Sequence, residues 1–360
     1  MRIAVGVGSR GIQNLYTIVE TTVNSLKELG AEPFIVSAMG SHGGGTEEGQ
    51  REVLAGYGIT EERLGVPVVT TVDTVYLGNC ANGRPVWFDR AAYEADLIVP
   101  INRVKLHTDF VGPIQSGLCK MLVIGLGNHK GCSAVHEEAP EVFADAIEET
   151  ARLILQKAPV GFGIAILENA YDKTYAVEAV PAEHLVEREK ELVQIAKGNM
   201  PYIMLDEADV IVCGAIGKDI SGAGFDPNIL GRSSVLKQFV LHIPRYQRLV
   251  LCDVTPASHG NGIGVGLFDV ITKKVAEQLD LESMYANAIA CNCLGDASVP
   301  CTVDDEETAI RVALKCCRNI DRDHPRIIRI QNTLHLGEIE VSEALLDAVR
   351  ADSRMSLIEN

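Results

Sequence analysis

The fold is decided by residues 2–36, which read RIAVGVGSRGIQNLYTIVETTVNSLKELGAEPFIV. The apolar runs at 2–7 and 34–36 are typical of buried strands. Between them, apolar residues recur every three or four positions from Ile12 onward, and Gly30 ends this helical pattern. A strand, a helix and a strand in this order predict a β-α-β unit, in which the two strands run parallel.

The same alternation continues along the chain. Further strands are predicted at 67–70, 75–78, 85–88, 96–101, 209–213, 248–252 and 327–330, and helices from Thr46 onward and at 139–157, 231–241, 267–279 and 304–317. The pattern predicts an α/β protein of two domains, with mostly parallel or mixed sheets flanked by helices. Because the loops at the carboxyl ends of such strands carry the chemistry, we expect an active site in the cleft between the domains.

The boundary between the two domains is predicted near residue 200. The length of 360 residues is about twice that of an average domain. Residues 187–201 close with a glycine and a proline, as in a hinge. We expect residues 1–200 to hold the main site and residues 201–330 to form a second α/β domain that closes over it. A helix within residues 331–360 is expected to pack back on the first domain.

The charge and composition of the chain exclude several classes of partner. Its 49 acidic and 32 basic residues give a formal net charge of −17. Because such a surface repels phosphate backbones and anionic lipid, we expect neither nucleic acid nor a membrane as a partner. No run reaches the ~18 apolar residues of a membrane span, and the N-terminus resembles a strand rather than a signal peptide. Ten cysteines spread over this length predict a cytoplasmic protein with reduced thiols.

The loop after the strand at 34–36 carries a candidate acid–base residue. It reads GSHGGGTEE from Gly40 to Glu48. Three consecutive glycines let a ligand approach the backbone, and Thr46 can cap the next helix. His42 can exchange a proton near neutral pH. The alternative is a tight strand–helix turn whose histidine is merely solvated.

A second loop combines cations with a histidine. Residues 102–109 read NRVKLHTD and follow a predicted strand. Arg103, Lys105 and His107 therefore form a candidate anion site in an otherwise acidic chain. The alternative is an ordinary basic loop.

A third segment carries a lysine among small and apolar residues. Residues 115–131 read QSGLCKMLVIGLGNHKG, and His136 follows. Apolar neighbours can lower the pKa of Lys120 and make it a nucleophile or a covalent anchor. His129 and His136 are seven residues apart, about two helical turns, so both could bind one metal ion or one could cap a helix.

Two glycine-containing turns complete the candidate set. In residues 8–11 (GSRG), Arg10 could bind a carboxylate through two hydrogen bonds, and the alternative is an exposed turn arginine. Residues 217–228 (GKDISGAGFDPN) follow a predicted strand of the second block. This loop is expected to face the first block across the cleft.

The order of these residues resembles the nickel-dependent lactate racemase family, including its hydroxyacid racemase and epimerase homologues. The resemblance covers most of the chain and is strongest from Arg10 to His136. Its motifs are an arginine in the first strand turn, an Ala-x-Gly-x-His stretch, and a second histidine before a Ser-Gly-x-x-Lys segment. They are matched by Arg10, by Ala38-Met39-Gly40-Ser41-His42, by His107 and by Ser116-Gly117-Leu118-Cys119-Lys120.

The resemblance implies an isomerase that racemises or epimerises a small 2-hydroxy acid. Arg10 would hold the substrate carboxylate, and His42 and His107 would act as base and acid. Proton abstraction from C2 beside a carboxylate is difficult, whereas removal of a hydride gives a flat 2-keto acid that can take the hydride back on either face. This route needs a hydride acceptor.

The resemblance also implies that acceptor. In the family it is a nickel-pincer nucleotide, nickel pyridinium-3,5-bisthiocarboxylic acid mononucleotide, tethered to a lysine through a thioamide. Lys120 would be the tether, with Ser116 and Gly117 beside it in the cofactor-binding segment. His136, or alternatively His129, would complete the nickel coordination. Cofactor maturation enzymes would then be partners of the chain.

The chain departs from lactate racemase itself at three positions. Val7 stands where the family has an acid, and Gly231 and Ser234 stand where the second block of lactate racemase has a glutamine and a lysine. We therefore expect a 2-hydroxy acid other than lactate as substrate. Two alternatives remain, namely a nickel- or nucleotide-binding protein without turnover, and a cofactor-free lyase or hydrolase that uses His42 and Lys120.

Overall fold

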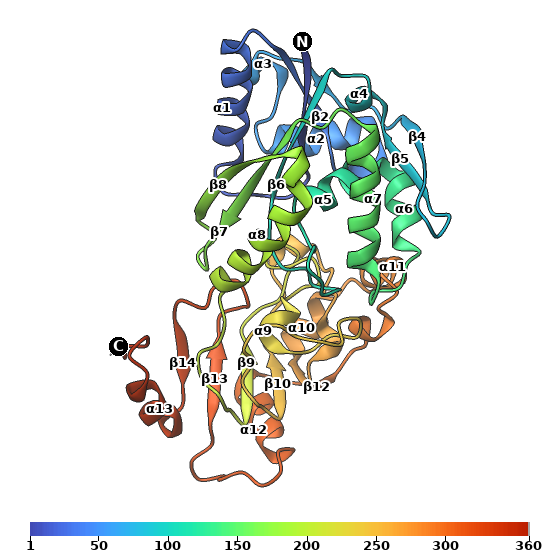
Figure 1. Cartoon of the computed structure of the whole chain (residues 1–360). Coiled ribbons are helices and arrows are strands. Elements are labelled where there is room, and N and C mark those ends of the chain that lie inside the picture. The colour runs from blue at the N-terminus through green and yellow to red at the C-terminus, as the bar shows by residue number, and fades with distance from the viewer. Residues whose placement is uncertain (359–360) are drawn as a thin grey trace. The chain divides into compact units, whose positions relative to one another are not determined.

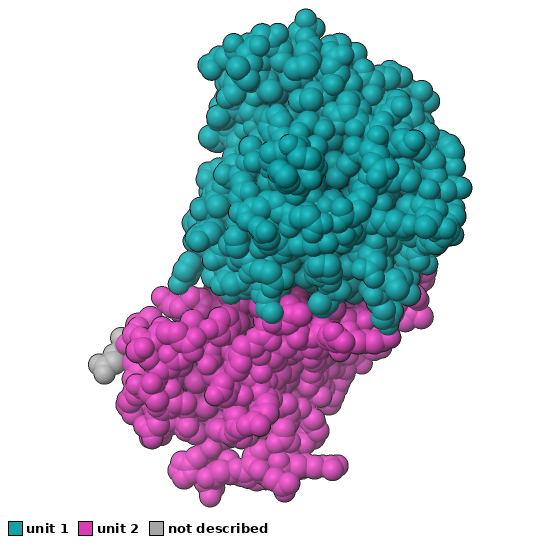
Figure 2. Space-filling model, viewed as in Figure 1, with its two compact units in different colours: residues 1–200 teal, residues 201–360 magenta. Residues whose placement is uncertain are grey.

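Two six-stranded sheets organise the chain (Figure 1). The computed structural model describes residues 1–358. The chain divides into two compact units, unit 1 (Met1–Met200) and unit 2 (Pro201–Asn360), which Figure 2 distinguishes by colour. Each unit contains one of the sheets.

The sheet of unit 1 has the strand order β3-β2-β1-β6-β7-β8. Its strands are β1 (Arg2–Val7), β2 (Glu32–Ser37), β3 (Val68–Val69), β6 (Leu97–Arg103), β7 (Phe162–Glu168) and β8 (Thr174–Pro181). All neighbours are parallel except β7 and β8, which are antiparallel. Val7 lies opposite both Ser37 and Ile101, so the carboxyl ends of β2, β1 and β6 lie side by side.

Helices cover this sheet and a short hairpin extends the unit. The helices are α1 (Leu15–Glu28), α2 (Glu47–Gly56), α3 (Glu61–Leu64), α4 (Arg90–Tyr93), α5 (Leu118–Lys120), α6 (Asn128–His136), α7 (Phe143–Lys157) and α8 (Leu185–Asn199), with a π-helical turn at Met121–Gly125. Strands β4 (Thr74–Asn79) and β5 (Pro85–Asp89) form an antiparallel hairpin. As predicted, Thr46 starts α2 by accepting a hydrogen bond from Gly49 N–H at 3.2 Å.

One hydrophobic core of unit 1 forms where α1 packs on the sheet. Val19 and Val23, one turn apart on α1, are buried in the same cluster as Val5 of β1 and Ile35 of β2. Burying a side chain of this size contributes roughly 1.5–3 kcal/mol relative to leaving it in water. This packing fixes the strand whose carboxyl end carries Arg10.

Unit 2 repeats the plan with the strand order β12-β11-β10-β9-β13-β14. The strands are β9 (Val210–Cys213), β10 (Arg248–Leu251), β11 (Val270–Thr272), β12 (Cys301–Val303), β13 (Ile327–Ile330) and β14 (Ile339–Val341), and the helices are α9 (Pro227–Leu230), α10 (Lys273–Gln278), α11 (Leu281–Ala290), α12 (Glu306–Lys315) and α13 (Leu346–Ala351). All neighbouring strands are parallel except β13 and β14. The predicted α/β class, with mostly parallel sheets flanked by helices, is confirmed.

Three predictions about local structure were wrong. Residues 187–201 are not a hinge, because all but the last two belong to α8. Residues 231–241 are not a helix, because Gly231 ends α9 with φ +68° and the Ser233 hydroxyl accepts the N–H of Leu236 at 2.8 Å in a turn. The segment at 267–279 is not one helix, because its residues 270–272 form β11 and only residues 273–278 form the helix α10.

For the segment that was expected to pack back on the first domain, residues 331–358 show packing within unit 2. β14 pairs with β13 in the sheet of unit 2. Leu345 and Val349 are buried in the main core of unit 2, beside residues of β9, β10 and β13. Burial of these side chains holds the segment in its own unit. Within residues 1–358, no helix has both the length and the apolar character needed to cross a membrane.

Candidate active site

Three neighbouring strands of unit 1 deliver the candidate residues to one edge of the sheet. Arg10 follows β1, His42 follows β2 and His107 follows β6. Because the carboxyl ends of these parallel strands are adjacent, the three loops converge. Arg10 is exposed, and its positive charge lowers the pKa of both His42 and His107.

The His42 loop is held by a buried glutamine. The Gln50 side chain accepts a hydrogen bond from the Ser37 hydroxyl at 2.6 Å and donates to the Gly40 carbonyl at 3.1 Å. Gly40 has φ +61°, and a Cβ there would come within 3.0 Å of the Ile124 carbonyl oxygen. The loop therefore requires a glycine directly before the histidine segment.

The His42 ring is held as a neutral base. Its Nδ1 forms a hydrogen bond with the Ser9 hydroxyl, and the Tyr57 hydroxyl donates to the Ser9 carbonyl at 3.0 Å. Although the residue keeps an exposed edge, the surrounding chain desolvates the ring, and the charges of Arg10 and Lys120 add to this effect. Together they lower the pKa of His42 to about 4. The imidazole is thus uncharged at neutral pH.

His107 and Lys120 form a direct pair. The Asp109 backbone N–H donates to His107 Nδ1 at 3.1 Å, so this nitrogen presents its lone pair. The ring proton of neutral His107 therefore resides on Nε2, which lies 2.5 Å from Lys120 Nζ. In this tautomer the hydrogen bond forms with the free-amine form of Lys120.

The pKa values of both members of the pair lie below their ordinary values. Burial, followed by the positive charge of Arg10, lowers the pKa of Lys120 to about 8, although the Asp109 carboxylate opposes the change. Burial and the Lys120 charge lower the pKa of His107 well below its ordinary value. The Phe110 ring stacks on His107 with centroids 4.3 Å apart and lies 5.8 Å from Lys120 Nζ. A lysine with a pKa of about 8 holds a larger share of free, nucleophilic amine near neutral pH than an ordinary lysine does.

Backbone hydrogen bonds place the segment before Lys120. The Lys105 N–H donates to the Ser116 carbonyl at 3.0 Å, and the Asn102 side-chain amide donates to the Gly117 carbonyl at 2.8 Å. Ser116 and Gly117 thus tie the lysine-bearing turn to the loop after β6. Their carbonyl groups are occupied by these bonds.

His136 presents one nitrogen to the site. It ends α6, and its Nδ1 donates to the Cys132 carbonyl at 2.7 Å, which leaves the Nε2 lone pair of the neutral ring for a ligand. Hydrogen bonding to the Cys132 thiol, 3.5 Å away, raises the pKa of His136. The charge of His136 also lowers the pKa of His42 and of His107, so the three imidazoles are electrostatic neighbours.

His129 is placed differently. It lies in the first turn of α6, is exposed, and has no part in the contacts that hold His136. Within residues 1–358, no group of three or more His, Cys, Asp or Glu side chains is arranged to hold a metal ion. Of the two histidines, His136 is therefore the one that the structure brings to Lys120 and His107.

The loop at 217–228 is stabilised within unit 2. The Lys218 ammonium donates to the Gly222 carbonyl at 2.6 Å, and its backbone N–H donates to the Ser258 hydroxyl at 2.9 Å. Asp226 caps α9 by accepting the Asn228 N–H at 2.9 Å. The polar residues of this loop thus bond to their own unit.

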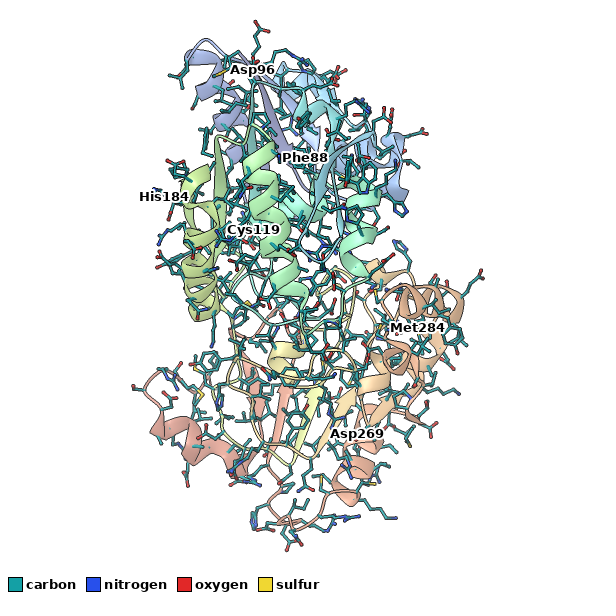
Figure 3. The ribbon with its side chains drawn as sticks, turned by 45° about the vertical axis from the view of Figure 1, so that its right-hand side comes forward. Phe88, Asp96, Cys119, His184, Asp269 and Met284 are labelled. Atoms are coloured by element: carbon teal, nitrogen blue, oxygen red, sulfur yellow. The ribbon has the colours of Figure 1, made fainter. Side chains whose placement is uncertain are left out.

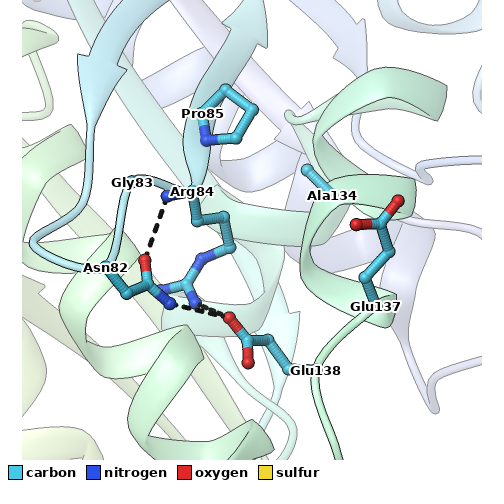
Figure 4. A pocket seen from close by; sticks show the side chains of 7 residues that line it. All are labelled: Asn82, Gly83, Arg84, Pro85, Ala134, Glu137 and Glu138. Atoms are coloured by element: carbon cyan, nitrogen blue, oxygen red, sulfur yellow. Dashed lines mark hydrogen bonds and ion pairs between the residues drawn. The ribbon is translucent and has the colours of Figure 1, made fainter.

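A cavity of about 440 Å³ lies elsewhere in unit 1 (Figure 4). Its lining is Asn82, Gly83, Arg84, Pro85, Ala134, Glu137 and Glu138. The buried Arg84 guanidinium there binds Glu138 and, at 2.9 Å, Glu149. None of the predicted site residues lines this cavity, and we attribute it to the packing of β5 on α6.

Several residues of the site were not predicted from the sequence. Ser9, Asp109 and Phe110 contact the two histidines, and each lies within a few residues of one that was predicted. Glu189 contacts the lysine-bearing turn from α8. Its signal is present in the sequence, because a glutamate there interrupts the apolar face formed by Leu185, Val186, Leu192 and Val193.

The comparisons with known proteins concern the same part of the chain. Residues 4–145, which include every residue from Arg10 to His136, match the family model of the lactate racemase N-terminal domain. The chain is similar in fold to the lactate racemase apoprotein from Thermoanaerobacterium thermosaccharolyticum, with a TM-score of 0.52 and 13% identity over 92% of this chain and 85% of that one.

A structural-genomics target protein from Thermotoga maritima is also similar, with a TM-score of 0.48 and 14% identity. That match covers 70% of this chain and 66% of that one, just under two thirds of its length. No curated protein matches the chain in sequence. Residues 4–145 are thus similar to the N-terminal domain of lactate racemase, and the chain as a whole is similar in fold to that protein.

Proposed function

We propose that the chain is a racemase or epimerase of a small 2-hydroxy acid, working with a covalently attached nickel-pincer nucleotide. The observation that carries the proposal is the pair formed by the Lys120 amine and His107 Nε2, 2.5 Å apart, at the edge of the sheet that also carries Arg10 and His42. A buried lysine with a lowered pKa beside two neutral imidazoles and an arginine combines an attachment point, two proton carriers and a carboxylate-binding group.

The residues present fit this cofactor. Lys120 offers an amine whose pKa is lowered to about 8 for the thioamide. His136 offers Nε2 with its other nitrogen fixed by a backbone carbonyl, the usual arrangement of a metal-bound histidine. A single histidine ligand suits a metal whose other ligands belong to the cofactor. When bound, the cofactor supplies the acceptor for the hydride of C2. Maturation enzymes would deliver it to the chain.

The two histidines would exchange the proton of the substrate hydroxyl. His42 is neutral at pH 7 and can accept it. Formation of the thioamide removes the positive charge of protonated Lys120, which lowers the pKa of both His42 and His107. Tethering therefore moves both pKa values back toward the range useful for acid–base catalysis at neutral pH.

Arg10 would orient the substrate through its carboxylate. The guanidinium is exposed at the carboxyl end of β1 and can form two parallel hydrogen bonds with a carboxylate. The chain has a net charge of −17, so the local positive charge of Arg10 is what attracts a small anion to this site. The departures at Val7, Gly231 and Ser234 favour a 2-hydroxy acid other than lactate.

The test is the intact mass of the full chain produced together with the cofactor maturation enzymes. We expect a cofactor adduct and bound nickel in the wild type and in Lys130→Ala, which removes an exposed lysine of α6, and neither in Lys120→Ala. The loaded wild type should then reduce the optical purity of at least one member of a panel of chiral 2-hydroxy acids.

Each other outcome selects a different function. A wild-type chain without adduct or nickel would overturn the proposal. An adduct without turnover on the panel would favour a nickel- or nucleotide-binding protein. Turnover by nickel-free protein would favour a cofactor-free lyase or hydrolase that uses His42 and Lys120.

A further inference from the structure

Glu189 is a buried carboxyl group that the proposed chemistry does not use. It lies on α8, has no exposed surface, and occupies a position that the helix otherwise fills with apolar side chains. An acidic side chain is rarely fully buried unless its oxygens are bound by donors. Its partners therefore indicate what it does.

The partners of Glu189 are groups of the lysine-bearing turn. Its Oε2 accepts the Cys119 N–H at 2.8 Å, and the Leu118 N–H and the Cys119 thiol also interact with the carboxyl group. The two N–H groups are among the first of α5, which have no acceptor inside the helix. Glu189 thus supplies from α8 the acceptor that α5 lacks.

The space around this contact is filled. A Cβ on Gly117 would lie 2.7 Å from the Glu189 carboxyl carbon, so the carboxyl group occupies the place of a side chain at that position. On its other side, Gly117 is held by the Asn102 amide at 2.8 Å. α5 packs against both α7 and α8, and Cys119, labelled in Figure 3, is fully buried there.

We propose that Glu189 is a positioning residue, whose hydrogen bonds to the start of α5 fix the turn that presents the Lys120 amine to His107. The inference rests on the proposed role of Lys120 as the attachment point. Lys120 is the next residue after Cys119, so a shift of this turn moves the amine away from its 2.5 Å contact with His107. The amine then gains water and its pKa rises.

The chemistry of Glu189 indicates which substitutions retain this function. Burial raises the pKa of its carboxyl group to about 7, although the Cys119 and Leu118 N–H groups oppose the change. Glutamine has the same shape and keeps one carbonyl oxygen as acceptor. Aspartate keeps the charge but is one methylene shorter, so its oxygens fall short of the Cys119 N–H. Alanine removes the acceptor altogether.

The experiment is competitive acetylation of the full, nickel-free chain with acetic anhydride between pH 6.5 and 9.5, with each lysine quantified by peptide mass spectrometry. In the wild type, Lys120 should label with an apparent pKa of about 8. In Glu189→Ala and Glu189→Asp, this value should move toward the ordinary ~10.4, with labelling at pH 8 reduced about tenfold or more. Glu189→Gln should remain within about twofold of the wild type.

Leu192→Ala is the matched control for loss of stability. It removes a buried side chain from the same helix but no hydrogen bond to α5. The proposal predicts an unchanged Lys120 profile in this variant, and unchanged labelling of Lys130 in all variants. If Glu189→Ala does not fold, Glu189→Asp and Glu189→Gln carry the comparison.

Wild-type labelling of Lys120 in the folded aspartate variant would overturn the inference, and so would an equal loss in Leu192→Ala. Because the measurement needs neither nickel nor substrate, it is independent of the test for the cofactor adduct. A missing adduct with the predicted labelling pattern would contradict the proposed function alone. The reverse result would contradict the positioning role alone.

Discussion

Both units place their first strand inside a six-stranded sheet and extend the sheet on either side of it. β1 lies between β2 and β6, and β9 lies between β10 and β13. Each sheet ends in an antiparallel pair, β7 with β8 and β13 with β14. In such sheets, the chain connections on the two sides of the central strand run in opposite directions. Ligands bind beside this point, at the carboxyl ends of the strands.

The loops at these two points differ in chemistry. In unit 1 they carry Arg10 and His107, close to a lysine with a lowered pKa. In unit 2 they carry Asp219, Thr255 and Ser258, in which Thr255 bonds to Asp219 and lies 2.9 Å from the Ser258 hydroxyl. The plan of the sheet is therefore compatible with either set of residues, and the proton chemistry that we propose depends on the loops of unit 1.

The buried acids of the two units differ as well. Asp89 and Glu189 of unit 1 are bound by amide and backbone N–H groups, and burial raises their pKa to about 6 and about 7. Asp209 of unit 2 instead pairs with the Arg326 guanidinium at 2.9 Å and with its backbone N–H at 2.8 Å. Asp89 and Glu189 thus lie buried without a cation beside them, whereas Asp209 is paired with one.

The largest effect is expected from removing an imidazole of unit 1. His107→Asn should lower the rate of racemisation by the cofactor-loaded chain about 10²- to 10⁴-fold, the usual loss on removing a general acid or base. The loss should be equal from either enantiomer, because the equilibrium constant of a racemisation is one. Polarimetry from both enantiomers measures it.

His324→Gln is the control from unit 2. His324 is an exposed loop residue at the amino end of β13, opposite the edge where ligands bind. A rate within about twofold of the wild type is expected, since His324 contacts Asp321 of its own loop and shares no partner with His107. An equal loss in both variants would contradict the assignment of the chemistry to unit 1.

The second effect concerns Glu189, the buried acid without a cation, and the pH dependence of the free energy of unfolding. The folded chain favours neutral Glu189, so between pH 4.5 and 7 it binds more protons there than the unfolded chain does, and the free energy of unfolding falls as pH rises. A shift of this size corresponds to about 3 kcal/mol. Glu189→Gln removes that dependence, so it should gain up to about 3 kcal/mol relative to the wild type between pH 4 and pH 8.

Urea unfolding at the two pH values measures this change. Glu183→Gln, which alters an exposed glutamate just before α8, is the matched control and should track the wild type at both. A difference between the glutamine variant at position 189 and the wild type that stays constant with pH would show that the buried carboxyl group is ionised throughout.

The third effect tests the paired acid of unit 2. Asp209→Asn removes the charge that Arg326 faces while keeping an oxygen for the backbone N–H. We expect a loss of about 2 kcal/mol in the free energy of unfolding at pH 7, below the 3–5 kcal/mol of a fully buried pair because Arg326 is partly exposed. Urea unfolding at pH 7 measures this loss. An unchanged free energy of unfolding would show that the ion pair of Asp209 contributes no net stability.

The sequence predicted the strands and the loops of the site better than the contacts within it. β1, α1 and β2 follow from apolar spacing, and Thr46 caps α2 as predicted, because these signals are local. The Lys120–His107 pair joins residues 13 positions apart, and the Glu189–Cys119 bond joins residues 70 apart. Neither separation leaves a periodic pattern in the sequence.

The errors in predicted structure have the same origin. The segment at 187–201 is rich in charge and closes with a glycine and a proline, which favoured a hinge, yet burial of Leu185, Val186 and Leu192 stabilises it as a helix. Because this segment was predicted to be a hinge and not a helix, Glu189 was not recognised as a buried residue. Tertiary packing overrode local propensity at the element that supports the site.

The smallest effect compares two threonine caps. Thr46 of unit 1 accepts the Gly49 N–H at 3.2 Å and donates to the Gly43 carbonyl at 3.1 Å. Thr272 of unit 2 accepts the Val275 N–H at 3.4 Å and donates to the Cys252 carbonyl at 2.9 Å. Replacing either with alanine should cost about 1 kcal/mol of stability, the usual value of a helix cap, as measured by urea unfolding.

Activity should separate the two caps. Gly43, Gly44 and Gly45 all have positive φ, and the Thr46 hydroxyl holds the first of them directly after His42. Loss of that bond lets the loop relax, so Thr46→Ala should slow racemisation about two- to fivefold, equivalent to less than about 1 kcal/mol in the barrier. Thr272→Ala should leave the rate unchanged. If both variants slowed the reaction equally, the loss would reflect stability rather than the position of His42.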